Sequence, residues 1–311
     1  MSASPRLPAA LAGLALAGAC LALPATAAPA PTDSPATPVG YSTFKGTIAE
    51  MTWPDVEKAA KGAVALWGIA VIEEHGPALP LGTDTYQVSS TSHQAQADLE
   101  KQGVKSLIVP PFEWGVNEAT GGFPGSIDVR PEIVTELMID VIKSLKNTGF
   151  AAVYCLPGHG DAKHNRAIYD AVKRSTDAGG IKAYMVTNLA LVTRLGLDPK
   201  DPVFVLTEQP APTGPPPTYI DGHSGSGEHS TMAGLYPGIV KLEVIPSLKG
   251  TNLGPADLAE WRKGYATARK ITPLGYFGQP AEFNPERGRQ NSALGAQRIA
   301  DAIAKSAKAG R

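Results

Sequence analysis

Four runs of apolar residues recur along the first two thirds of the chain. They have the continuity expected of strands that are buried on both faces, and they cover residues 64–72, 104–110, 150–156 and 181–186. Segments with helical character separate these runs, and they cover residues 53–61, 84–102, 130–149 and 165–176. Strands that alternate with helices of this length predict βαβ units. We therefore expect an α/β fold, with a mainly parallel sheet flanked by helices.

Residues at the segment ends support the helix assignments. Pro54 lies where the first turn of a helix tolerates proline, and Thr83 is expected to cap the helix over 84–102. Gly149 is expected to end the helix that begins near Pro131. That helix has apolar residues on one face, namely Val134, Leu137, Met138, Val141 and Leu145.

The last third of the chain has a weaker pattern. Residues 208–217 are rich in proline and predict a surface loop. Residues 228–236 and 291–308 have helical character, and the chain contains no internal repeat. A single domain over residues 41–311 is the simplest organisation.

The first forty residues differ from the rest in composition. An apolar run over residues 7–23 follows Arg6 and precedes Ala25-Thr26-Ala27, a small-x-small site that signal peptidase accepts. We interpret residues 1–27 as a signal peptide and residues 28–40 as a disordered lead-in, so the protein is expected to be exported to the periplasm or secreted. A lipoprotein with Cys20 as the lipidated residue is the less favoured alternative.

Charge and cysteine content narrow the function. The formal net charge is −1 and no run of Lys or Arg stands out, so neither nucleic acid nor an anionic membrane is expected as a partner. Beyond the predicted signal peptide only Cys155 remains, inside the apolar run over 150–156. We interpret it as a core residue, and the exported chain would contain no internal disulfide.

Potential metal ligands follow two of the predicted strands. Glu73 and His75 come directly after the first strand, and a loop containing Gly76 and Pro80 can fold Asp84 back beside them. Chemistry in an open parallel sheet gathers beyond the carboxyl ends of strands. A carboxylate, an imidazole and a second carboxylate are ligands that suit Zn²⁺ or Mn²⁺.

The third predicted strand ends in a similar way. His159 and Asp161 follow it, and the glycines beside His159 allow the backbone to approach closely. With Glu73, His75 and Asp84, these make five potential ligands, too many for one tetrahedral zinc ion. They suit a pair of divalent cations about 3.5–4 Å apart, bridged by a carboxylate.

A third segment carries a histidine and a glutamate on a loop rich in Gly and Ser. His223 and Glu228 lie at its two ends, before a predicted helix. A flexible surface turn is the favoured explanation of this segment taken alone, so the segment by itself does not indicate a function. A hydrolase that uses Ser224 or Ser226 instead of metal is disfavoured, because no G-x-S-x-G elbow follows a strand.

Several of these segments occur together in one protein family. The stretch GIAVIEEHGPALPLGTDT at residues 68–85 resembles the signature of the creatininase (creatinine amidohydrolase) family. Residues 123–127 are similar to its FPGT segment, and Gly158-His159-Gly160 is similar to its NGHGG segment. Residues 223–230 resemble its HAG-x-x-ETS segment, and residues 275–288 resemble its C-terminal motif. The motifs occur in family order, over residues 42–307.

The resemblance implies a set of residue roles. Glu73, Asp84 and His159 match the ligands of one metal. His75 and Asp84 match ligands of the other, with Asp84 bridging. A residue after His159 completes that second set. It is Asp161 or, if residues 161–163 are an insertion, His164; we favour Asp161. His223 matches the family's proton-transfer histidine, and Glu228 matches the glutamate expected to orient it or the substrate.

The same resemblance implies an activity and an assembly. The family hydrolyses C–N bonds of small amides, with two divalent cations per chain, and usually forms hexamers, so a homo-oligomer is expected. This chain has Tyr219 where one tryptophan of the creatinine pocket would fall, so its substrate is expected to be a creatinine-like cyclic amide, a lactam or a short peptide. The alternative is a catalytically silent relative that acts as a periplasmic binding or scaffold protein. Pro157 in place of the usual asparagine keeps this alternative open.

Overall fold

The computed structural model describes residues 41–209 and 219–310. The predicted signal peptide, the lead-in over 28–40 and Cys20 lie outside the described residues, as does most of the proline-rich segment. Within the described ranges, none of the helices combines the length and the apolar character that a membrane crossing needs.

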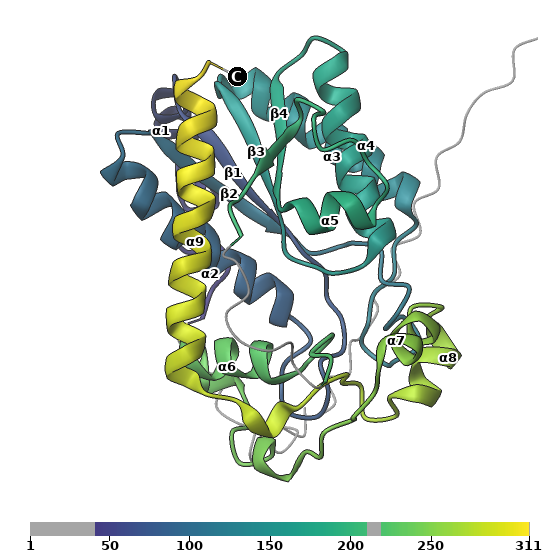
Figure 1. The fold of residues 1–311 in the computed structure, drawn as a ribbon. Helices are drawn as coiled ribbons and strands as arrows, with labels where there is room; N and C mark the ends of the chain where they lie inside the picture. The colour runs from purple at the N-terminus through teal and green to yellow at the C-terminus, as the bar shows by residue number, and fades with distance from the viewer. Residues whose placement is uncertain (1–40, 210–218, 311) are drawn as a thin grey trace, which may run out of the picture. The chain divides into compact units, whose positions relative to one another are not determined.

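The centre of the fold is a five-stranded parallel sheet with strand order β2-β1-β3-β4-β5 (Figure 1). The strands are β1 (Val64–Ile69), β2 (Ser106–Phe112), β3 (Ala152–Pro157), β4 (Lys182–Thr187) and β5 (Phe204–Leu206). The prediction of a single α/β domain with a parallel sheet is confirmed. The sequence pattern missed β5, and it extended β1 to residue 72, although the strand ends at Ile69.

Two layers of helices cover the sheet (Figure 1). On one face, α1 (Trp53–Ala60), α3 (Pro131–Thr148) and α4 (Ala162–Asp177) bury the side chains of alternate strand residues such as Trp67 and Cys155. On the other face, α2 (Thr83–Lys101) packs beside α9 (Pro285–Lys308) over residues such as Leu66 and Tyr154. Alternation along each strand supplies both cores, as expected for a sheet buried on both faces.

The helix predictions hold with shifts at their ends. Gly149 ends α3 with φ 102°, a left-handed conformation that glycine adopts without a Cβ clash. On α3 the buried face includes Thr135 and Ile142, whereas Leu137 is 43% exposed, so the predicted apolar face was partly wrong. Cys155 is fully buried and free, which confirms its interpretation as a core residue.

The segment between β4 and α9 is mostly irregular. It contains four short helices that were not all predicted, α5 (Leu189–Arg194), α6 (Ser226–Leu235), α7 (Pro255–Trp261) and α8 (Tyr265–Ile271). Single turns of 3₁₀-helix complete the described chain, η1 (Ile48–Glu50), η2 (Pro237–Ile239), η3 (Ile245–Ser247) and η4 (Pro280–Glu282).

The strand order places a functional site at a defined point. The chain leaves β1 toward β2 on one side and later returns to β3 on the other, so connections diverge between β1 and β3. In open parallel sheets, ligands bind beyond the carboxyl ends of the strands at such a switch point.

Candidate metal centre

The ends of β1 and β3 bring the predicted ligands together. The two strands pair in register up to Ile69 and Pro157, so the residues that follow them leave the sheet at the same edge. The loop after β1 returns to the start of α2, and the backbone N–H of Glu73 donates to the carbonyl oxygen of Leu81 at 3.0 Å. This return places Asp84, in the first turn of α2, beside the end of β1.

Asp84 occupies the middle of the cluster. Its Oδ2 lies 3.0 Å from Nδ1 of His159, and its Oδ1 lies 3.3 Å from Nε2 of His75. Each carboxylate oxygen therefore faces a different imidazole, one from each strand end. The positive end of the α2 dipole also favours a negative charge at this position.

Glu73 completes the first side of the cluster. Its Oε1 lies 2.9 Å from Nδ1 of His159, and its Oε2 accepts a hydrogen bond from Thr120 Oγ1 at 2.5 Å. Both Glu73 and Thr120 are buried. The carboxylate is thus held with one oxygen toward His159.

Glu228 lies on the opposite side. It belongs to the first turn of α6, and its Oε2 is 3.9 Å from Nε2 of His75. The same oxygen accepts the backbone N–H of Ser224 at 2.5 Å, where Ser224 adopts φ 46°. Asp221 supports the turn, because its carboxylate accepts the N–H groups of Ser226 and Gly227 at 2.8 Å each.

These side chains form overlapping sets of three within the described residues. In each set the potential ligand atoms lie within 4.8 Å of one another, and the first two sets share Asp84. The three sets are Glu73, Asp84 and His159; His75, Asp84 and Glu228; and Glu73, His75 and His223.

His223 is held by backbone contacts on both of its sides. It forms an isolated antiparallel bridge with Phe277, whose N–H donates to the carbonyl oxygen of His223 at 2.7 Å. Its ring Nε2 donates to the carbonyl oxygen of Glu74 at 2.8 Å. When the ring is neutral, Nδ1 then carries the lone pair, and this atom lies 3.8 Å from Oε1 of Glu73.

The electrostatics couple the imidazoles to the carboxylates. Burial by itself lowers the pKa of His75, but Asp84 and Glu228 outweigh it and raise that pKa to about 9. Burial also opposes protonation of His223, and the charges of Glu73 and Glu74 raise its pKa to about 10. For Asp84, burial raises the pKa, but the hydrogen bond from His159 and the nearby imidazole of His75 lower it well below its usual range. Positive charge at this position is therefore strongly favoured.

The donor set fits divalent cations. His75 donates Nδ1–H to the carbonyl oxygen of Glu73 at 3.2 Å, so Nε2 is its ligand atom, and this buried Nε2 has no hydrogen-bond partner. Ligand atoms about 2.0–2.2 Å from one cation lie roughly 3–4 Å from each other. The separations of 2.9, 3.0, 3.3 and 3.9 Å within the two sets that share Asp84 agree with this spacing. A bound cation would displace the imidazole protons.

The structure does not bring Asp161 into these sets. Its Oδ1 accepts the N–H groups of Lys163 and His164, at 2.7 and 3.0 Å, and caps α4. His164 is also outside them; its Nδ1 accepts the N–H of Val116, and burial lowers its pKa to about 3. Its ring packs against that of His159, with centroids 5.3 Å apart.

A cavity of about 330 Å³ opens beside the cluster, a volume typical of small-molecule sites. Trp261 lines it, is buried, and lies 5.5 Å from the ring of His223 between centroids. Its Nε1 donates to Thr272 Oγ1 at 2.8 Å. The sequence pattern missed this tryptophan, because nothing in the irregular segment around α7 indicates proximity to His223.

Comparison with known proteins assigns the chain to a family. The sequence model of the family described as "Creatininase: Creatinine amidohydrolase" matches residues 49–303. The chain belongs to the creatininase family. The resemblance drawn from the sequence motifs is thereby confirmed.

Two relatives show how the family resemblance is distributed. Creatinine amidohydrolase from Pseudomonas putida is 24% identical over 268 residues, which cover 82% of this chain and 95% of the relative. The 3-dehydro-scyllo-inosose hydrolase from Thermotoga maritima is 33% identical over 89 residues, which cover 28% of this chain and 27% of the relative. The names of both relatives describe hydrolases.

Solved creatininase structures share the fold. A structure described as "Creatininase Mn" has a TM-score of 0.62 and 20% identity, and covers 84% of this chain and 98% of that chain. A putative creatinine amidohydrolase from Bacteroides fragilis has a TM-score of 0.62 and 20% identity, with coverages of 85% and 97%. A variant creatininase is described as the Zn-Zn type, with a TM-score of 0.60, 21% identity and coverages of 86% and 98%. Two of these descriptions name metals, Mn and Zn.

Proposed function

We propose that this protein is an amidohydrolase that holds two divalent cations bridged by Asp84 and hydrolyses the C–N bond of a small amide. One observation carries the proposal: the two oxygens of Asp84 face two different imidazoles, those of His75 and His159. A carboxylate in this position can bind one cation with each oxygen, as in two-metal hydrolases.

The remaining ligands divide between the two cations. Glu73 and His159 would hold one cation with Asp84, and His75 and Glu228 would hold the other. We assign Glu228 to the position that the sequence resemblance gave to Asp161, because Asp161 is engaged in capping α4. Mixed oxygen and nitrogen ligands accept either Zn²⁺ or Mn²⁺.

When bound, the cations would supply the Lewis acidity that activates water and polarises the amide carbonyl. The chain itself would move the proton. His223 lines the cavity and is fixed through Nε2, so its Nδ1 can accept a proton and pass it to the leaving nitrogen. The C–N bond breaks, the water oxygen joins the carbonyl carbon, and the nitrogen leaves as a neutral amine.

Glu74 supports His223 in this role. Its Oε1 lies 3.3 Å from Nε2 of His223, and its Oε2 accepts the N–H of Gly76 at 3.0 Å. A carboxylate there stabilises the imidazolium that forms when Nδ1 takes up a proton. Glu74 is thus a positioning residue rather than a catalytic one.

The cavity limits the substrate to a small molecule. The apolar ring of Trp261 lines the cavity beside His223, and side chains of the metal centre line it as well. A creatinine-like cyclic amide, a lactam or a short peptide would place its carbonyl at the cations and its apolar part against Trp261.

We further propose that the reaction takes place outside the cytoplasm and that the protein works as a homo-oligomer. Export is inferred from the apolar run over residues 7–23 and the Ala25-Thr26-Ala27 site. The oligomer, a hexamer in the usual family arrangement, is inferred from the family resemblance. N-terminal sequencing of the exported protein and its mass in solution test these two proposals.

Metal analysis combined with an amide screen tests the proposed function. The purified protein is loaded with Zn²⁺ or Mn²⁺, its cation content is measured, and creatinine, lactams and short peptides are assayed. We expect about two cations per chain and turnover of at least one amide class that chelation abolishes. Two bound cations without any turnover, or no bound cation, would favour the silent binding protein instead.

A further inference from the structure

Part of the lining of the metal cavity lies outside the ligand sets, and we call this part the mouth. The mouth carries an excess of positive charge. Lys163, Arg194 and Arg262 line the cavity outside the ligand sets, together with the carboxylates of Glu118 and Asp161. Lys163 forms an ion pair with Glu118. Among the described residues, neither arginine takes part in an ion pair, so the mouth retains two guanidinium groups against one carboxylate, that of Asp161.

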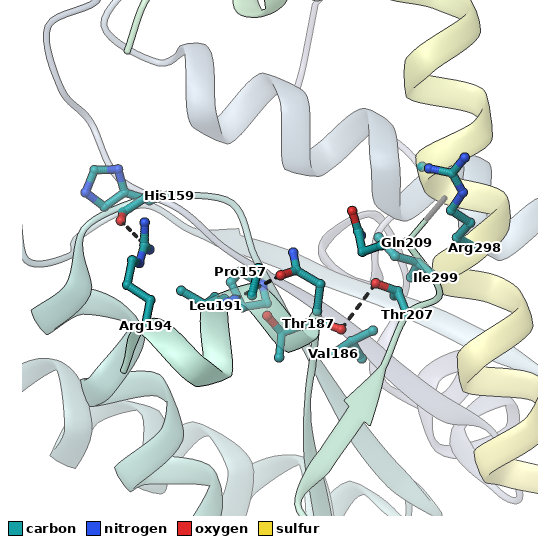
Figure 2. A pocket seen from close by; sticks show the side chains of 14 residues that line it. Pro157, His159, Val186, Thr187, Leu191, Arg194, Thr207, Gln209, Arg298 and Ile299 are labelled. Carbon is teal, nitrogen blue, oxygen red and sulfur yellow. Dashed lines mark hydrogen bonds between the residues drawn. The ribbon is translucent and has the colours of Figure 1, made fainter. Parts of the chain in front are cut away.

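Arg194 is held next to the metal centre. It is the last residue of α5, and its Nη2 donates to the carbonyl oxygen of Gly160 at 2.8 Å, one residue after His159 (Figure 2). The guanidinium has five N–H donors, so one backbone bond leaves most of them for a ligand. The side chain also lines a neighbouring cavity of about 480 Å³ and therefore stands between the two cavities.

Arg262 brings a second guanidinium to the same mouth. It follows Trp261 directly, at the end of α7, and its side chain makes no hydrogen bond within the described residues. Partial burial lowers the pKa of Arg194, the charge of Arg262 lowers it further, and Asp161 partly offsets both. The two guanidinium groups line the same cavity, so their like charges repel each other. An anion bound between them would relieve that repulsion.

We propose that Arg194 and Arg262 bind a carboxylate of the substrate, so that the enzyme acts on amides that carry an acidic group away from the scissile bond. This inference rests on the proposed function. Guanidinium groups match carboxylates in shape and charge, and charge-assisted hydrogen bonds are among the strong ones. With cations bound at the metal centre, the whole cavity would attract anions.

Pairs of amides that differ in one charge test the proposal on the cation-loaded protein. Pyroglutamate is compared with pyroglutaminol, and N-acetylglycine with N-acetylethanolamine, by kcat/KM and by calorimetric binding. The acidic member of at least one pair is expected to bind about 10–100-fold more tightly, as a charge-assisted contact provides. The proposal would be overturned if both acids bound no more tightly than their neutral partners, or if neither acid bound at all.

Arginine variants separate this contact from direct binding of the carboxylate to the cations. In R262Q and in the R194Q/R262Q double variant, the ratio of the affinity for the acid to that for the neutral amide is expected to fall toward one. R262K is expected to retain part of the preference for the acid. The matched control is R298Q, because Arg298 projects from α9 into the neighbouring cavity alone (Figure 2). A ratio that survives in the double variant would place the carboxylate on the cations and overturn the proposal.

The proposed function is read out separately in the same samples. Cation content and turnover of neutral amides report on the metal centre, whatever the arginines do. A wild-type protein without cations or without any amide turnover would refute the proposed function, whereas intact turnover without acid preference would refute the arginine contact alone.

Discussion

The ligand cluster and the cavity mouth are built from different kinds of structure. Glu73, His75 and His159 lie within six residues of the ends of two central strands, and these strands pair in register up to Ile69 and Pro157. Trp261 and Arg262, by contrast, come from a short helix in an irregular segment far along the chain. Most of the cluster is buried, with His159 and Glu228 partly buried, and its members contact one another, whereas both arginines at the mouth are exposed.

This difference separates chemistry from selectivity. A parallel sheet holds side chains at its carboxyl edge with little freedom, which suits ligands that must share two cations. Irregular segments vary in sequence and length at little cost to the fold, which suits contacts that select a substrate. Substitutions in the cluster should therefore change metal content or turnover, whereas substitutions at the mouth should change the preference for acidic over neutral amides.

The largest effect is expected from Asp84→Asn. The asparagine cannot bridge two cations, so metal content should fall and amide turnover should drop by at least about 10⁴-fold. Metal analysis and single-turnover assays of the same sample measure both. Wild-type turnover with two cations still bound would show that Asp84 does not bridge them.

His223→Ala should affect turnover and spare the cations. Loss of the group that passes the proton to the leaving nitrogen is expected to lower kcat by about 10²–10⁴-fold. The cation content should equal that of the wild-type protein. Loss of cations in this variant would instead identify His223 as a ligand, in line with its place near Glu73 and His75.

Glu228→Gln should remove one cation and leave the other. The set of Glu73, Asp84 and His159 stays intact, so the content should fall from about two cations per chain toward one. Turnover is expected to fall by about 100-fold. An unchanged cation content would mean that Glu228 is not a ligand and that the family position of Asp161 must be reconsidered.

Asp161→Ala should have the smallest effect. The variant loses a helix N-cap, which lowers the free energy of unfolding by about 1 kcal/mol. Chemical denaturation measures this change, and metal analysis should find both cations still bound. A loss of one cation would contradict the assignment of Asp161 as a cap.

Much of the cluster could be predicted from the sequence, for physical reasons. Buried parallel strands read as continuous apolar runs, so polar residues directly after them mark the functional edge. Glu73, His75, Asp84 and His159 were found in this way, and the structure brings them together. The α/β fold with its parallel sheet followed from the same runs.

The mouth and one ligand position could not be predicted in the same way. Asp161 and Glu228 are both acids near a helix start, and only the path of the chain decides which of them faces His75. Trp261 and Arg194 lie on short helices with no periodic pattern that relates them to the sheet. Their positions depend on long-range packing, which local sequence patterns do not encode.

Anomalous diffraction from crystals of the metal-loaded protein locates the cations and so tests whether Asp84 is shared between two of them. Two anomalous peaks are expected about 3.5–4 Å apart, one on each side of the Asp84 carboxylate. One peak should lie beside Glu73 and His159, and the other beside His75 and Glu228. A single peak, or a peak bound by Asp161 or His164, would show that Asp84 does not hold a pair of cations with Glu73, His75, His159 and Glu228.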